Sequence, residues 1–126
     1  AREEVFKLAI QYDVATQVMH AVRRALSDPE RLQQIVVESI NNGEIDPSVV
    51  EITSPLGFLE RAGESITDIA YRFCRHEPGV SVVLTGTGNP DHLAKNVSAI
   101  NGDRVPGKII EELNRIFGFV RSTSAD

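Results

Sequence analysis

The sequence has 126 residues and a net charge of −5. This length suits one domain with a buried core, and the acidic balance argues against a general nucleic-acid surface, which needs a basic excess. With one cysteine, Cys74, no internal disulfide can form. No apolar run approaches the roughly 20 residues of a membrane-spanning helix. We therefore expect a cytoplasmic protein that binds neither membrane nor nucleic acid.

The N-terminal third of the chain predicts two helices with an ambiguous segment between them. Residues 2–12 have acidic residues in the first turn and an apolar face, which predict a helix. Residues 14–18 suit a short strand, although apolar spacing here also fits a helix, and we expect a strand or loop followed by a helix. Residues 27–43 predict a helix with Ser27 or Asp28 as its N-cap, Pro29 in its first turn and Asn42-Gly43 at its end.

The rest of the chain predicts a connection, three helices and one strand. Residues 44–63 hold two prolines and two glycines and predict a connection with one short helical turn. Residues 64–79 have apolar residues at helical spacing and end in Pro-Gly, which predicts a helix. Val80–Leu84 is short, apolar and β-branched, as in a strand buried on both faces. Residues 89–100, with Asn89 as the N-cap and Pro90 in the first turn, and residues 106–119 predict the last two helices.

This order of elements implies more strands than the sequence supplies. One clear strand cannot form a sheet alone, whereas an apolar strand between amphipathic helices is typical of one unit of a parallel α/β sheet. We expect one domain over residues 1–126, predominantly helical with one or two short parallel strands, and a disordered tail over residues 119–126. A mostly α-helical bundle is the alternative. Because an incomplete sheet exposes strand edges and apolar helix faces, we also expect a homo-oligomer.

The stretch "DIAYRFCRHEPGVSVVLTGTGNPDHLAKNVSAI" (residues 68–100) resembles the C-terminal part of the aldo/keto reductases. In that family a helix, a Pro-Gly-Val turn, a strand and a glycine precede a helix with Gln-Leu and Glu-Asn pairs. "SPLGFLERAG" resembles the family's Ser-Pro-Leu-Gly-Gly-Gly-Leu loop in altered form, and "VPGKIIEELNRIFG" its closing helix. The match runs from about residue 54 to residue 118. It implies an α/β fold, the C-terminal part of a (β/α)8 TIM barrel, which as a whole usually takes about 250 residues.

The resemblance implies that NADP(H) binds at the loop after the strand Val80–Leu84. Barrel enzymes commonly hold a phosphate with the loops after their last strands and the N-terminus of a helix. Glycines let the backbone approach the anion, and free N–H groups at the start of the following helix would favour its charge. The residues at the matching positions, which we take as the candidate cofactor-binding site, are Gly86, Thr87, Gly88, Asn89, His92 and Asn96.

Within this set the matches to the family differ in kind. Gly86 matches the family glycine, and Asn96 matches the asparagine that contacts adenine. His92 stands where glutamine is usual, and Gly88 stands where the family has serine or arginine beside the adenosine 2′-phosphate, so the choice between NADP and NAD stays open. Lys95 replaces a glutamate and either pairs with a phosphate or is solvated. A tight strand-to-helix turn is the alternative explanation of the glycines.

The catalytic side of the resemblance is missing. The family reduces carbonyl compounds with an Asp-Tyr-Lys-His set, and Tyr12, Tyr71 and His20 do not lie in a matching context. We therefore assign no catalytic residue and no metal ligand. The expected function is that of the cofactor-binding C-terminal portion of an NADP-dependent aldo/keto reductase-like oxidoreductase. Such a chain is not catalytic alone, and a carbonyl substrate binds only the full-length protein. A non-enzymatic helical assembly or protein-interaction domain is the alternative.

Overall fold

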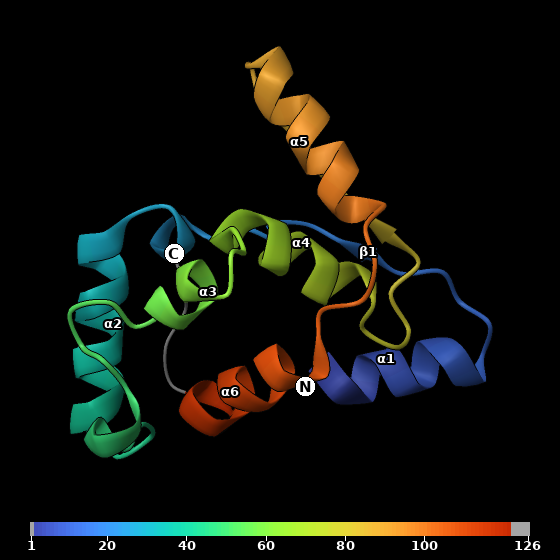
Figure 1. Cartoon of the computed structure of the whole chain (residues 1–126). Helices are drawn as coiled ribbons and strands as arrows, with labels where there is room; N and C mark the ends of the chain where they lie inside the picture. The colour runs from blue at the N-terminus through green and yellow to red at the C-terminus, as the bar shows by residue number, and fades with distance from the viewer. Residues whose placement is uncertain (1, 122–126) are drawn as a thin grey trace. The chain divides into compact units, whose positions relative to one another are not determined.

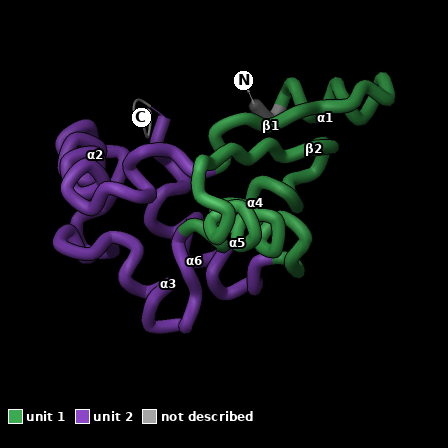
Figure 2. Tube along the Cα trace, turned by 90° about the horizontal axis from the view of Figure 1, so that it is seen from above, with its two compact units in different colours: residues 1–21, 67–104 green, residues 22–66, 105–126 purple. Residues whose placement is uncertain are grey.

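The computed structural model describes residues 2–121, which form mainly α-helices and one two-stranded parallel sheet (Figure 1). The predicted predominance of helices with short parallel strands is confirmed. Most of the predicted disordered tail, residues 119–126, lies outside the described residues. The chain divides into two compact units (Figure 2): the first holds Ala1–Ala21 and Thr67–Arg104, and the second holds Val22–Ile66 and Val105–Asp126.

The first unit contains three helices and both strands. Its elements are α1 (Arg2–Gln11), β1 (Gln17–Val18), most of α4 (Ile66–Arg75), β2 (Val82–Val83) and α5 (Pro90–Ile100). β1 and β2 are parallel, with Gln17 opposite Val82 and Val18 opposite Val83. The short strand expected within residues 14–18 is therefore present, and its partner is the strand expected after the Pro-Gly turn.

β2 is shorter and more exposed than the sequence predicts. Val83 is only 8% exposed, whereas Val82 is 47% and Leu84 41% exposed. Successive strand residues point to opposite faces, so one face of β2 is covered and the other is open. The prediction of a strand buried on both faces is therefore wrong for Val80–Leu84, because no described element covers the face that carries Val82 and Leu84.

The turn between α4 and β2 is joined tightly to the segment around β1. Gly79 adopts a positive φ of 90° and lies against the backbone of Phe6 in α1. The Thr16 hydroxyl donates a hydrogen bond to the carbonyl of Gly79. The Thr16 N–H donates to Ser81 Oγ (3.0 Å), and the Ser81 N–H donates to Thr16 Oγ1 (3.2 Å). These reciprocal bonds hold Thr16 and Ser81, the residues just before the two strands, side by side.

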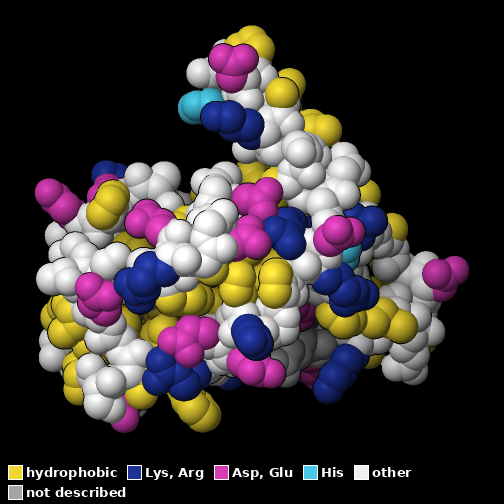
Figure 3. Space-filling model, in the orientation of Figure 1, with side chains coloured by type: hydrophobic (Ala, Val, Ile, Leu, Met, Phe, Trp, Pro, Cys, Tyr) yellow, Lys and Arg dark blue, Asp and Glu magenta, His cyan; other side chains and the backbone are white. Residues whose placement is uncertain are grey.

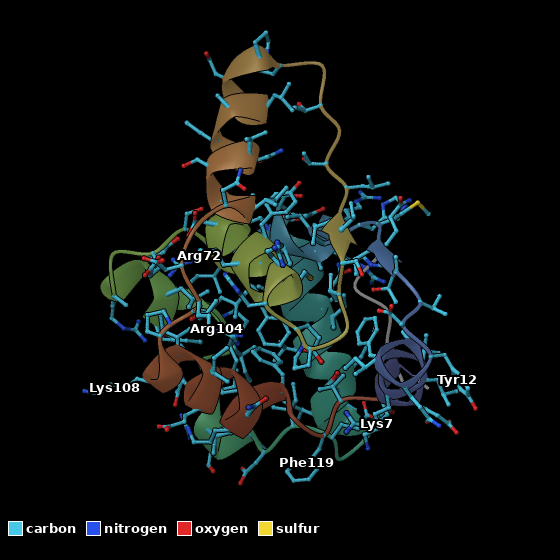
Figure 4. All side chains as sticks on the ribbon, turned by 90° about the vertical axis from the view of Figure 1, so that its right-hand side faces the viewer. Lys7, Tyr12, Arg72, Arg104, Lys108 and Phe119 are labelled. Atoms are coloured by element: carbon cyan, nitrogen blue, oxygen red, sulfur yellow. The ribbon has the colours of Figure 1, made fainter. Side chains whose placement is uncertain are left out.

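A single arginine attaches the segment after α5 to α4. Arg72 donates from Nε to the carbonyl of Asp103 (2.7 Å) and from Nη2 to the carbonyl of Arg104 (3.1 Å). Its Nη1 also donates to Asp68 one turn earlier on α4 (3.0 Å). The arginine side chain is only 13% exposed, and the three bonds described here all go to residues of this unit (Figure 4 labels Arg72 and Arg104).

The first unit carries most of the exposed apolar surface. The apolar face predicted for residues 2–12 consists of Val5, Leu8, Ala9 and Tyr12. Ala9 is buried, whereas the other three are exposed. Among the residues whose burial the structure describes, ten of the thirteen exposed large hydrophobic residues belong to this unit. They are Val5, Leu8, Ile10, Tyr12, Val14, Met19, Val82, Leu84, Leu93 and Val97.

All regular elements in the described part of the second unit are helical. Its elements are the 3-10 turns η1 (Arg24–Leu26) and η2 (Pro47–Val49) and the helices α2 (Pro29–Asn41), α3 (Gly57–Arg61) and α6 (Gly107–Phe117). The helix expected before residue 27 is one 3-10 turn. The connection expected over residues 44–63 contains two short helical segments rather than one.

Local capping signals fix the ends of α2 as the sequence predicts. Asp28 is the N-cap, and its carboxylate accepts from the Arg31 N–H (3.1 Å), while Pro29 occupies the first turn. Asn42 is the C-cap, and Gly43 follows with a left-handed φ of 73°. Each cap satisfies backbone groups that the helix itself leaves unpaired, so these boundaries follow from neighbouring residues alone.

A compact apolar core joins α2 and α6 in the second unit. It consists of the buried side chains Val36, Ile45, Val50 and Ile116, with partly buried apolar residues around them. Two sets of hydrogen bonds near the surface of this unit shift pKa values. The Ser48 N–H lowers the pKa of the Asp46 carboxyl. A hydrogen bond from Arg115 lowers the pKa of Glu112, and the same bond raises the pKa of Arg115. An exposed ion pair such as Glu112–Arg115 contributes little to stability.

Among residues 2–121, no helix has both the length and the hydropathy that crossing a membrane requires.

Candidate functional site

The six candidate residues occupy one continuous region of the first unit. The loop from Leu84 to Asn89 connects β2 to α5, which begins at Pro90. The remaining two candidates lie in the first two turns of that helix. The loop contributes Gly86, Thr87, Gly88 and Asn89, and α5 contributes His92 and Asn96.

Asn89 closes the N-terminus of α5 with its own side chain. Its Oδ1 accepts from the N–H of Asp91 (2.9 Å) and of His92 (3.4 Å). The Leu93 N–H bonds to the carbonyl of Asn89 (3.0 Å), and Pro90 has no N–H. The expectation of free N–H groups at this helix end is therefore wrong, because asparagine is among the strongest N-cap residues and takes them first.

Free donors lie instead in the loop before the helix. Within residues 2–121, the N–H groups of Gly86, Thr87 and Gly88 make no hydrogen bond to the chain. Successive backbone N–H groups in a turn form the kind of concavity that binds anions. The Thr87 hydroxyl accepts from the Asn89 N–H (3.2 Å), so its proton is available as a further donor.

The two loop glycines are not required by the turn itself. Neither Gly86 nor Gly88 has a positive φ, and a Cβ added to either one would meet no atom within 4 Å. The loop would therefore tolerate a side chain at both positions. The space beside each glycine is open to solvent, which suits a close approach of a ligand to the backbone.

Three polar side chains meet where β2 ends, and we refer to them as the Thr85 cluster: Tyr71, Thr85 and Asn96. The hydroxyls of Tyr71 and Thr85 are 2.8 Å apart and share a hydrogen bond. The side-chain amide of Asn96 donates to Thr85 Oγ1 (2.9 Å). Tyr71 is buried, at 6% exposure, and the other two are half-buried. The candidate Asn96 is thus tied to the strand end through a residue that the sequence did not single out.

The other polar residues of α5 are exposed. Residues 91–95 are all exposed, and α5 projects away from the strands and from α4 of the same unit (Figure 1). Acidic, basic, histidine and hydrophobic side chains all lie on the surface of this helix (Figure 3). The side chains of His92 and Lys95 make no hydrogen bond or ion pair with other described residues. Both are available to a ligand, whereas the carboxylate of Asp91 in the first turn opposes an anion at the helix end.

The remaining side chains that often carry chemistry are metal ligands, the cysteine and the tyrosines. The described residues contain no group of three or more His, Cys, Asp and Glu side chains placed to hold a metal ion. The cysteine, Cys74, is half-buried. Of the two tyrosines, Tyr71 shares its hydroxyl with Thr85, and Tyr12 is 68% exposed. The loop can hold an anion through its N–H groups, and Asn96 can bind a polar edge.

No family model matches the chain, and no solved structure matches it significantly. The resemblance to the aldo/keto reductases therefore remains a proposal from the sequence.

Proposed function

We propose that this chain is the C-terminal, cofactor-binding portion of an NADP-dependent aldo/keto reductase-like oxidoreductase and is not catalytic alone. The observation that carries the proposal is the strand–glycine loop–helix arrangement. Thr85 follows β2 by two residues, the N–H groups of Gly86, Thr87 and Gly88 are free within the described chain, and Asn96 bonds to Thr85. This arrangement supports a phosphate on the loop and an adenine near Asn96.

The proposed fold, part of a (β/α)8 TIM barrel, is supported by what the first unit leaves uncovered. Parallel sheets normally have both faces buried and more than two strands. Here β1 and β2 form a two-stranded parallel sheet, and the face that carries Val82 and Leu84 is open. The apolar residues Leu93 and Val97 of α5 are also 43% and 46% exposed. Further parallel strands would cover these surfaces.

The hydrogen-bond donors and the cation of this region are the groups that the phosphates of NADP(H) would bind. Phosphate oxygens accept hydrogen bonds from the loop N–H groups and the Thr87 hydroxyl, and Lys95 supplies the one cation of α5. The bound cofactor would supply a hydride to a carbonyl substrate of the full-length protein. This chain would position the adenosine end. It holds no aldo/keto reductase catalytic set, so no proton transfer to substrate is assigned to it.

Titration of the purified chain with NADPH, followed by nucleotide fluorescence, tests this function. We expect saturable but weak binding, with a Kd on the order of 0.1–1 mM, because the chain would supply only part of a cofactor groove. Replacing Gly86 by valine should raise the Kd at least about tenfold, because a side chain there fills the space that a phosphate needs. The fold should be unchanged, since an added Cβ meets no atom within 4 Å.

The same variant separates the proposal from the simpler explanation by a tight turn. If the glycines serve only the turn, Gly86→Val leaves NADPH affinity unchanged. Absence of any NADPH binding by the wild-type chain would contradict the proposed function. Oxidation of NADPH with an aldehyde by the chain alone would contradict the statement that it is not catalytic.

A second candidate, a non-enzymatic helical domain that assembles with further copies of itself, is favoured by the exposed apolar residues of the first unit. On α1 alone Val5, Leu8 and Ile10 are 57%, 47% and 59% exposed. Burial of such side chains between copies would favour a homo-oligomer. We expect a dimeric or larger mass in solution scattering at micromolar concentration. A monomeric mass would count against assembly and leave the nucleotide-binding proposal standing.

A further inference from the structure

We propose that Thr85, supported by Tyr71, sets the orientation of the Asn96 carboxamide and thereby makes the nucleotide site selective for adenine over hypoxanthine. This inference rests on the proposed function, since it concerns the base that the site would recognise. It identifies Thr85 and Tyr71 as positioning residues. Both act through Asn96 and neither is expected to touch the nucleotide.

The orientation follows from the hydrogen bonds of the Thr85 cluster. Asn96 Nδ2 donates to Thr85 Oγ1 (2.9 Å), so the nitrogen side of the carboxamide faces the strand end. Thr85 is held in turn by the hydroxyl of Tyr71 (2.8 Å), and Tyr71 is buried. When Thr85 donates its one proton to the Tyr71 hydroxyl, its oxygen can only accept, and it then binds the nitrogen side of the Asn96 carboxamide. The three side chains therefore fix one another.

This arrangement leaves a defined edge of Asn96 for a ligand. Oδ1 accepts no hydrogen bond from the described residues, and the second N–H of the carboxamide is also unused. An adjacent acceptor and donor on one amide match the N6 amino group and N7 of adenine. Hypoxanthine has a carbonyl oxygen in place of the amino group. That oxygen would face Oδ1, acceptor against acceptor, and the hydrogen bond would be lost.

The experiment compares the binding of NADPH with that of its hypoxanthine analogue, reduced nicotinamide hypoxanthine dinucleotide phosphate, to the full chain. The wild-type chain should prefer NADPH by about tenfold, the effect expected of one hydrogen bond replaced by two opposed acceptors. Thr85→Val keeps the side-chain volume but removes the hydroxyl that anchors Asn96. The preference should then fall to about twofold or less, because the carboxamide is free to turn.

A second variant guards against loss of folding. Thr85→Val alone leaves the buried Tyr71 hydroxyl without its partner, which destabilises a folded chain. The double variant Tyr71→Phe/Thr85→Val removes both hydroxyls and should fold while losing the preference. Ser98→Ala, which removes an exposed hydroxyl from the same helix, is the matched control and should keep it.

The outcomes distinguish this inference from the proposed function. If the wild-type chain binds neither nucleotide, the proposed function fails and the inference fails with it. If the chain binds both nucleotides equally, or prefers the hypoxanthine analogue, the orientation of Asn96 is not the one assigned here. If the double variant keeps the full preference for NADPH, Thr85 and Tyr71 do not position Asn96. In the last two cases nucleotide binding itself still stands.

Discussion

Replacing Leu59 by alanine is expected to lower the free energy of unfolding by about 3 kcal/mol, within the usual range for a buried leucine. Leu59 is only 1% exposed and is the largest of the fully buried side chains in the described part of the chain. It lies in α3, which spans five residues. A helix this short is not stable by itself in water, so its packing has to hold it. Loss of the leucine therefore removes both buried apolar surface and the contacts that keep α3 folded.

Urea unfolding followed by far-ultraviolet circular dichroism measures this effect. Leu93→Ala is the matched control, because it makes the same change on a helix where the leucine is 43% exposed. We expect the control to cost less than about 1 kcal/mol, since most of the lost surface is already in water. Equal effects of the two substitutions would mean that Leu59 is not buried as described.

Signals confined to neighbouring residues were sufficient to predict several elements. The ends of α2 follow from Asp28-Pro29 at the start and Asn42-Gly43 at the end, and the structure places both caps there. The helical spacing of apolar residues likewise predicted α4 and α6, and the cap at Asn89 with Pro90 in the first turn predicted α5. Caps and periodicity act over one or two turns, so their outcome depends little on the rest of the chain.

Features that depend on distant parts of the chain were not predictable in the same way. The apolar pattern of Val80–Leu84 predicts burial on both faces, yet burial depends on what covers each face, and the described chain covers only one. The two-residue length of β1 is set by its pairing with β2, more than sixty residues later. Tyr71 and Thr85 bond across fourteen positions, and nothing in the periodicity of α4 marks that contact.

At the candidate site the sequence identified the loop but not the donors. Asn89 was expected both to cap α5 and to leave free N–H groups for a phosphate, and these two roles compete for the same donors. In the structure the Asn89 side-chain oxygen accepts the N–H groups of Asp91 and His92, because it belongs to a residue close to them in the chain. The free donors are therefore those of Gly86, Thr87 and Gly88, one step earlier in the chain.

Replacing Gly79 by alanine is expected to destabilise the first unit by about 3 kcal/mol, through backbone strain of about 1 kcal/mol and a steric clash of about 2 kcal/mol. Gly79 has a φ of 90°, a conformation that residues with a side chain rarely adopt. An added Cβ would also lie 2.9 Å from Phe6 Cβ and 3.0 Å from the Phe6 carbonyl oxygen. Because one of these atoms is backbone, the clash cannot be relieved by turning a side chain.

Gly63→Ala separates the two causes and serves as the control for Gly79→Ala. Gly63 has a similar φ of 77°, but a Cβ there meets no atom within 4 Å, so the control should cost only the strain, about 1 kcal/mol. The chain has two tyrosines and no tryptophan, and Tyr12 and Tyr71 both belong to the first unit. Tyrosine fluorescence during urea unfolding therefore reports on the unit that contains Gly79. Far-ultraviolet circular dichroism in the same titrations covers the second unit, which contains Gly63. Equal losses in the two variants would show that Phe6 does not pack against the turn, and the joint between α1 and the start of β2 would then have to be held by Thr16 and Ser81 alone.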